Sequence, residues 1–267
     1  MKAFIKKEFL EQMKGNGIWV AAILLFMTSV FLLSEARGYP SGNALEAFFL
    51  NTFDLYVYII PLLCLFLAAF SVYGEKENKT FQMIVTRKES YTSYFLKKSI
   101  SLQVVLLIAF IMIYLLVIIL ATIILNKDIA HGWYFITSLL VLQIIFVQLG
   151  VFIGGITKSK MQMIGFLIGA WFLIIFIVDL IYIYFIPFVD YDNVHIFSLA
   201  YFLNPLHTVR LYLEAGLGIF DMSNLSSMMN RLIQVSPGVY LILNAVLWPI
   251  IFYLLTIFFK NDGEIND

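Results

Sequence analysis

Six apolar runs constrain this chain of 267 residues more than any other feature of its sequence. Each can cross a bilayer core of about 30 Å, the first only if neighbouring residues extend it. The runs are Ile18–Leu33, Leu55–Val72, Ile100–Leu125, Tyr134–Ile156, Met163–Ile186 and Val239–Phe259. Backbone groups find no water in a bilayer core, so spanning runs of this kind form helices. The sequence therefore predicts an all-α integral membrane protein, with one transmembrane domain over residues 1–267.

Composition supports this class and excludes others. Only 13% of the residues are charged and mean hydropathy is +0.93, whereas about a quarter of the residues of a soluble domain are charged. The formal net charge is zero, which excludes a generally basic, nucleic-acid-binding protein. Cys64 is the single cysteine, so no disulfide can form within the chain, and we interpret it as a buried packing residue.

The distribution of basic residues predicts the orientation. With six spans both termini share one side, and that side collects 13 of the 17 lysine and arginine residues. The positive-inside rule places this side in the cytoplasm. Both termini are therefore predicted to be cytoplasmic.

Three segments outside the spans carry the functional signals. Residues 1–17 place apolar and charged side chains at helical spacing, which predicts a helix lying in the inner membrane interface. Residues 73–98 form a charged linker with a mostly apolar middle, Thr80–Val85, which predicts a short amphipathic helix on the cytoplasmic side. Residues 187–237 are predicted to form an outer loop, whose stretch Phe197–Leu217 is apolar enough to form helices at the membrane.

No catalytic constellation is evident in the sequence. The chain lacks a GxxxxGK[ST] phosphate-binding loop, so we expect no nucleotide hydrolysis by that mechanism. Asp179 is the one acid deep in a predicted span, without an obvious cationic partner, and such carboxylates are functional candidates. His195, His207 and nearby methionines offer soft ligands, but without a tight ligand spacing we assign no metal site. Glycines at Gly150, Gly154 and Gly155, and at Gly165 and Gly169, predict close helix packing.

Glu75 and Glu77, Thr80, Met83 to Val85, Ser90 and Lys98 follow one another along the linker. This pattern resembles that of type 2 ABC transporter permeases, in which acidic residues, Gly-Thr, leucines, Pro-x-Ser-Arg and a lysine precede the third span. Lys79 replaces the glycine, Lys88 the proline and Tyr91 the arginine. The resemblance implies that this linker is a coupling helix in a groove of a separate ATPase. The implied contact residues are Glu75, Glu77, Thr80, Phe81, Met83, Ile84, Val85, Arg87 and Lys88.

A narrower motif consists of Leu203-Asn204-Pro205, followed by Arg210, with Ser236-Pro237 ahead of a span that contains Trp248. This motif resembles the NosY group of these permeases. His207 stands where that group commonly has an acidic residue. The resemblance marks Asn204, Pro205, His207 and Arg210 as an outer motif. It also suggests a role in copper-site maturation of nitrous oxide reductase, with a NosD-like periplasmic partner.

The resemblance implies a membrane subunit rather than an enzyme. Two copies would pair in a bacterial or archaeal cytoplasmic membrane and use a pair of ABC ATPase subunits, which bind the ATP and Mg²⁺, so that this chain itself holds no cofactor. Export of a peptide, lipid or drug is an alternative to the NosY-like role. A secondary transporter that uses Asp179 as its coupling acid, and a non-transporting scaffold, are rivals from other classes. A secondary transporter needs no coupling helix between its second and third spans.

Overall fold

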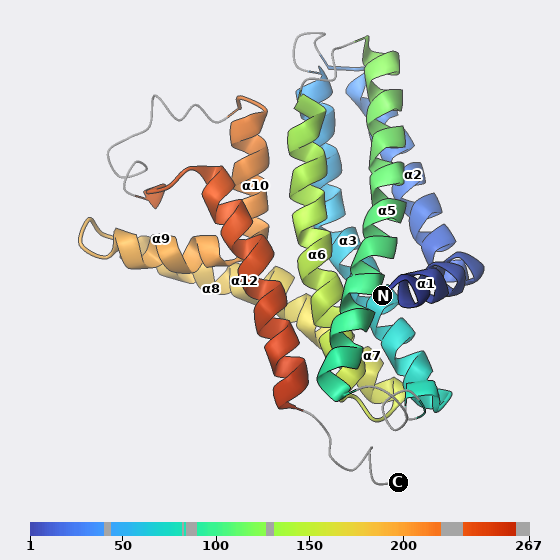
Figure 1. Ribbon diagram of the computed structural model, residues 1–267. Helices are drawn as coiled ribbons and strands as arrows, with labels where there is room; N and C mark the ends of the chain where they lie inside the picture. The colour runs from blue at the N-terminus through green and yellow to red at the C-terminus, as the bar shows by residue number, and fades with distance from the viewer. Residues whose placement is uncertain (40–43, 82, 84–89, 127–130, 220–231, 260–267) are drawn as a thin grey trace.

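The computed structural model describes residues 1–39, 44–81, 83, 90–126, 131–219 and 232–259 (Figure 1). Within these ranges, six helical segments are long and apolar enough to cross a membrane. They are α2 (Asn16–Ala36), α3 (Ala44–Glu77), α5 (Tyr91–Leu125), α6 (Gly132–Ile156), the composite segment Lys160–Phe188 and α12 (Pro237–Phe258). This confirms the predicted class, an all-α integral membrane fold with six candidate spans.

Two helices extend beyond the predicted spans into the predicted linker. Helix α3 continues through Val72 to Glu77, and α5 begins at Tyr91 rather than at Ile100. The polar first turns of α5 are helical because the Ser90 side chain accepts a hydrogen bond from the backbone N–H of Ser93, which caps the helix. The connection between the two helices is therefore shorter than the predicted linker, and both of its ends are helical.

Helix α6 lies at the centre of the bundle, in contact with α3, α5, α10 (Pro205–Gly216) and α12. Of its apolar stretch, 78% is buried inside the chain. Glycines allow the close approach to α3: a Cβ at Gly150 would lie 2.7 Å from the Leu65 carbonyl oxygen, and one at Gly154 would lie 2.8 Å from that of Ala69. The predicted packing role of these glycines is confirmed. The prediction was wrong for Gly165 and Gly169 within the described residues, because a Cβ at either would meet no atom within 4 Å.

The fifth candidate span is irregular. It begins as α7 (Lys160–Phe172), passes through a π-helical turn at η2 (Leu173–Ile177), and continues as α8 (Val178–Phe185) and the short 3₁₀ turn η3 (Ile186–Phe188). Only 11% of its apolar stretch is buried. Figure 1 shows α8 projecting sideways from the bundle, next to α9 (Val194–Leu203), before α10 and α12 return along it. The predicted helices of the 187–237 segment are thus α9 and α10.

The N-terminal helix α1 (Lys2–Lys14) lies across the bundle near α2 and α5 (Figure 1). Gly15, in an extended conformation, separates it from α2. The helix is present as predicted, but its buried face is not purely apolar: Glu8 and Gln12 are buried, whereas Phe9 is exposed. A helix that buries a glutamate needs a cationic partner in its neighbours, and the partner comes from α5.

Candidate functional site

A buried charge network joins α1, α3 and α5 next to the connection between α3 and α5. Its centre is Lys98, which lies inside α5 and is 0% exposed. The ammonium group donates to Ser71 Oγ at 2.8 Å, to Glu75 Oε1 at 2.6 Å and to the carboxylate of Glu8. An ammonium group has three protons to donate, so each proton of Lys98 has an acceptor.

The two carboxylates have further donors. Glu75 accepts hydrogen bonds from Lys7 Nζ at 2.7 Å and from the hydroxyl of Tyr94. Glu8 accepts a bond of 2.9 Å from the Ser71 hydroxyl, which itself accepts from Lys98. Glu8 is 0% and Glu75 5% exposed. The network therefore closes on itself, and its two lysines and two glutamates cancel in charge.

Charges buried in this way are expensive. Moving one ion out of water costs several kcal/mol even after relaxation, which a pair repays only with good geometry and complete hydrogen bonding. Burial raises the pKa of Glu8 despite the opposing charge of Lys98. Burial alone would lower the pKa of Lys7, but its hydrogen bond with Glu75 and the charge of Glu75 outweigh burial and raise it. A fully satisfied polar network also rigidifies its surroundings, so α1, α3 and α5 are fixed to one another here.

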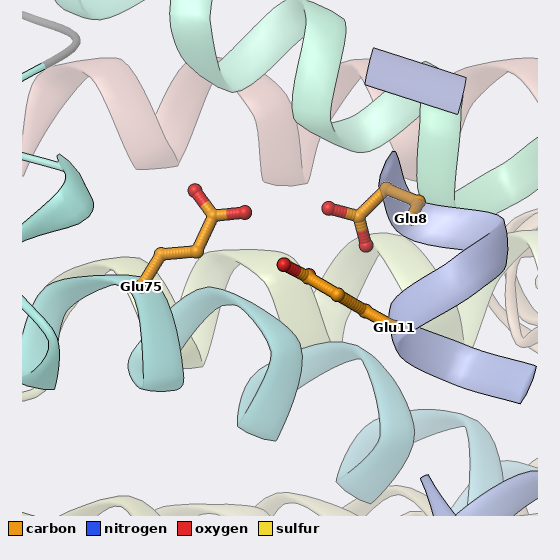
Figure 2. Close-up of side chains that lie close together, drawn as sticks. All are labelled: Glu8, Glu11 and Glu75. Atoms are coloured by element: carbon orange, nitrogen blue, oxygen red, sulfur yellow. The ribbon is translucent and has the colours of Figure 1, made fainter. Parts of the chain in front are cut away.

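Figure 2 shows the carboxylates of Glu8 and Glu11, from α1, and of Glu75, from α3, pointing toward one another. One oxygen of each lies within 4.8 Å of the others, as in a possible cation site. The ammonium groups of Lys98 and Lys7 already pair with these carboxylates and offset two of the three negative charges: Lys98 binds Glu8 and Glu75, and Lys7 Nζ lies 2.7 Å from Glu75 and 3.7 Å from Glu11. The arrangement is therefore best described as an ion-pair network.

Two more contacts fix the ends of the connection to the bundle. Phe81 is buried against the rings of Tyr91, Tyr94 and Phe95, with ring centroids 6.0, 5.0 and 5.9 Å away. Lys76, near the end of α3, donates to the carbonyl oxygens of Gly155 at 2.7 Å and Thr157 at 3.0 Å. A cation is favourable at those carbonyls because the C-terminus of a helix, here α6, carries partial negative charge.

The predicted ATPase-contact residues fall into three groups. Glu75 and Phe81 are buried within the chain, so their side chains hold the connection in place rather than facing a partner. Glu77 and Met83 are exposed, Met83 to 60%, and Thr80 is partly buried, with its hydroxyl donating to the Glu75 carbonyl oxygen at 3.1 Å. The other predicted contacts, Ile84, Val85, Arg87 and Lys88, lie outside the described residues.

A cleft with a volume of about 790 Å³ borders the network. Leu63, Phe66 and Leu67 of α3 line its apolar part, and Lys7 and Glu11 of α1 line its polar part. The charge network is therefore buried inside the bundle, but it lies beside an open space between α1, α2 and α3.

The outer motif forms a second polar cluster, away from the network. The Asn204 side chain caps α10 by accepting from the Leu206 N–H at 3.0 Å, and Pro205 occupies the first position of that helix. Arg210 lies 2.9 Å from Glu214 and 3.3 Å from Asp54 of α3. The motif thus ties α10 to the neighbouring span.

Asp179 has a neighbour that the sequence did not reveal. Its Oδ1 lies 3.1 Å from Nε2 of His207, although the two atoms do not have hydrogen-bond geometry. The imidazole stacks on Tyr201, with ring centroids 3.9 Å apart. Burial, with a contribution from the charge of Arg210, lowers the pKa of His207 to about 4. With its pKa lowered to this value, His207 is neutral at physiological pH.

Sequence reasoning missed Glu8, Lys7 and Tyr94, and it treated Lys98 as the end of a linker. One signal was available. Lys98 is followed directly by 26 mostly apolar residues, Ser99 to Ile124, so it could be expected to belong to the same helix as that run.

Models of known protein families and curated protein sequences give no match to this chain.

Proposed function

We propose that this chain is the membrane permease subunit of an ABC exporter. Two copies would pair in a bacterial or archaeal cytoplasmic membrane, with both termini in the cytoplasm. Two separate ATPase subunits would bind ATP and Mg²⁺ and drive the pair. The proposal includes the pairing of two copies and the binding of an ATPase to each. The resemblance of the linker to that of type 2 permeases supports it.

The observation that carries the proposal is the fixation of both ends of the α3–α5 connection. The pair of Lys98 and Glu75 links α5 to α3. Glu8 links α1 to Lys98, and Lys76 of α3 binds the C-terminal end of α6. A force applied to the connection is then passed to four helices together, because a satisfied buried network resists local deformation. A motor-driven subunit needs such a rigid joint, whereas an ordinary loop between two spans does not.

The exposed part of the connection supports the same function. Met83 places a large apolar side chain on the surface, 60% exposed, next to the buried anchor Phe81. Methionine adapts to irregular apolar surfaces and is frequent at binding interfaces. An ATPase groove that receives Met83 and its neighbours would close during the ATP cycle and move the joint as one body.

The cargo is a further part of the proposal. The NosY-like motif favours copper-site maturation of nitrous oxide reductase, together with a NosD-like periplasmic protein. In that case α9 and α10 would change their grip on the periplasmic protein. Export of a peptide, lipid or drug is the alternative within the same class.

The decisive experiment compares two methionines. The chain is co-expressed with its candidate ATPase as wild type, Met83→Asp and Met161→Asp, and complex recovery and ATP turnover are measured in nanodiscs. Met161 is the matched control because it is 81% exposed but lies at the start of α7. We expect Met83→Asp to reduce recovery and turnover about tenfold or more, since a charge would have to be buried in an apolar contact. Met161→Asp should retain both.

Other outcomes would contradict the proposal. If neither variant changes recovery or turnover, the connection does not dock on that ATPase and the lever mechanism fails. If the chain alone in liposomes moves solute in response to a proton or sodium gradient, and Asp179→Asn abolishes the movement, the chain is a secondary transporter instead.

A further inference from the structure

The cleft between α1, α2 and α3 has a polar end and an apolar end. Its volume of about 790 Å³ falls in the range of about 300–1,000 Å³ that is usual for small-molecule sites. Glu11 of α1 and Asn16, the first residue of α2, line the polar end, and Leu63 of α3 lines the apolar end. Leu63 lies twelve residues before Glu75, which is about 18 Å along the helix. Neither the proposed coupling role nor the pairing of two copies uses this cleft.

The polar end carries more negative than positive charge. Glu8, Glu11 and Glu75 bring three carboxylates together (Figure 2), whereas Lys7 and Lys98 bring two ammonium groups. Glu11 has the longest of these ion pairs, because Lys7 lies 3.7 Å from it but 2.7 Å from Glu75. The Glu11 side chain is 47% exposed. It can therefore take a further cation from the cleft.

The beginning of α2 provides a place for an anion in the same cleft. Gly15, Asn16 and Gly17 all line it. Gly15 is the N-cap and has no side chain, and no described side chain accepts a hydrogen bond from the N–H groups of the first turn. The indole N–H of Trp19 donates to the Met13 carbonyl oxygen at 3.1 Å, which fixes the corner between α1 and α2. Free N–H groups and the helix dipole make such a terminus favourable for a phosphate.

A third lining group is a buried amide without a partner. Gln12, next to Glu11 in α1, lines the cleft and is only 8% exposed. Its amide makes no hydrogen bond to any described residue, yet neither of its polar atoms is enclosed by the chain. Leaving a buried polar group unpaired is costly. An amide has both donors and an acceptor, so Gln12 can bind an anionic and a cationic group of the same ligand.

We infer that the cleft binds phosphatidylethanolamine from the adjacent membrane leaflet. The ammonium group of the lipid pairs with Glu11, and its phosphate lies at the N–H groups of Asn16 and Gly17. Gln12 donates to the phosphate and accepts from the ammonium group. Glu11 and Gln12 lie just before the first span, which is the depth of lipid headgroups, and an acyl chain follows α3 toward Leu63. This inference does not depend on the proposed partnership with an ATPase.

The expected preference follows from the headgroup. An ammonium group with three N–H donors can bond to both Glu11 and Gln12, whereas the trimethylated nitrogen of phosphatidylcholine has no N–H group. Phosphatidylglycerol has no cation and would leave the excess negative charge of the polar end without a partner.

The test measures labelling of the purified chain in detergent by a phosphatidylethanolamine that carries a photoreactive acyl chain. Unlabelled competitors are phosphatidylethanolamine, phosphatidylcholine and phosphatidylglycerol with identical acyl chains, and soluble phosphoethanolamine. We expect phosphatidylethanolamine to compete about tenfold better than either of the other lipids, the order of one charge-assisted hydrogen bond. Phosphoethanolamine should not compete, because it lacks the acyl chain that the apolar end receives.

Two pairs of variants test the location. Glu11→Gln removes the carboxylate of the site, and Glu35→Gln makes the same change at an exposed residue at the other end of α2. Only Glu11→Gln should lose the preference for phosphatidylethanolamine over phosphatidylcholine. Gly74→Phe places a ring in the cleft, whereas Gly165→Phe places one on α7, and a Cβ at either glycine would meet no atom within 4 Å. Saturable labelling should be lost only in Gly74→Phe.

Several results would overturn the inference. They are equal competition by phosphatidylethanolamine and phosphatidylcholine, stronger competition by phosphatidylglycerol, and competition by phosphoethanolamine as strong as that of the lipid. An unchanged preference in Glu11→Gln, or equal labelling of the two phenylalanine variants, would do the same.

Discussion

His207 has an environment that differs from that of an ordinary solvated histidine. Its side chain is 13% exposed and lies between the ring of Tyr201 and the carboxylate of Asp179. Arg210, one turn further along α10, adds a positive charge that disfavours a second one. The pair with Asp179 is consequently a contact between a carboxylate and a neutral imidazole, which packs the fifth span against α10.

This environment predicts a pH dependence of stability. The pKa of His207 is lowered from 6.5 to about 4 in the folded chain, so the unfolded chain binds more protons between these values. Stability is therefore fully present above about pH 6.5 and falls as the pH approaches 4, by on the order of 2 kcal/mol between pH 7 and pH 5. Thermal unfolding in detergent should show a smaller loss for His207→Phe, which keeps the stacked ring. His195→Phe, an exposed histidine on α9, is the control. An identical pH profile for wild type and His207→Phe would refute this account.

At the scale of the helices, Lys98 is the main connection between α1, α3 and α5. Lys98→Met should destabilise the chain by about 3–5 kcal/mol, because it leaves two buried carboxylates without their shared cation. Lys97→Met is the matched control: Lys97 is only partly buried and lies 5.9 Å from the ring of Phe4, so its loss should cost less than about 1 kcal/mol. Unfolding temperatures in detergent measure both.

A double variant separates charge compensation from packing. In Lys98→Met with Glu8→Gln, the remaining carboxylate, Glu75, keeps Lys7 at 2.7 Å. We therefore expect the double variant to recover part of the stability lost in Lys98→Met. If Lys98→Met costs no more than Lys97→Met, the network is not the joint that the proposed function requires.

The same helices show what the sequence could and could not predict. Long apolar runs specify spans, and the presence and approximate place of all six followed from them, as did α1 and the helical nature of 197–217. The ends of α3 and α5 did not follow, because Glu75 and Lys98 read as solvated linker charges when considered alone. Glu75 and Lys98 are stable inside helices because they pair with each other across 23 residues of sequence. Glu8, from a third helix, also pairs with Lys98.

The candidate site was predicted less completely than the fold for a related reason. The linker pattern predicted a site at the α3–α5 connection, and it assigned Glu75 and Phe81 to an external contact although both are buried. A residue pattern cannot distinguish an exposed contact from an anchor one turn away. The partner of Asp179 was likewise hidden, because His207 lies 28 positions further along the chain and approaches only when α10 folds back.

For the molecule as a whole, the distribution of lysine and arginine predicts that the α3–α5 connection faces the cytoplasm. Single cysteines test this, since Cys64 is fully buried and gives the wild type a low labelling background. Asn78→Cys lies in the connection, and Tyr39→Cys lies beyond the opposite end of α2; both positions are exposed. With a membrane-impermeant maleimide, Tyr39→Cys should label in intact spheroplasts and Asn78→Cys only after lysis. The reverse pattern would put the joint around Lys98 on the side without ATP. No cytoplasmic ATPase could then reach the connection, and the buried network would have to serve a function within the membrane domain alone.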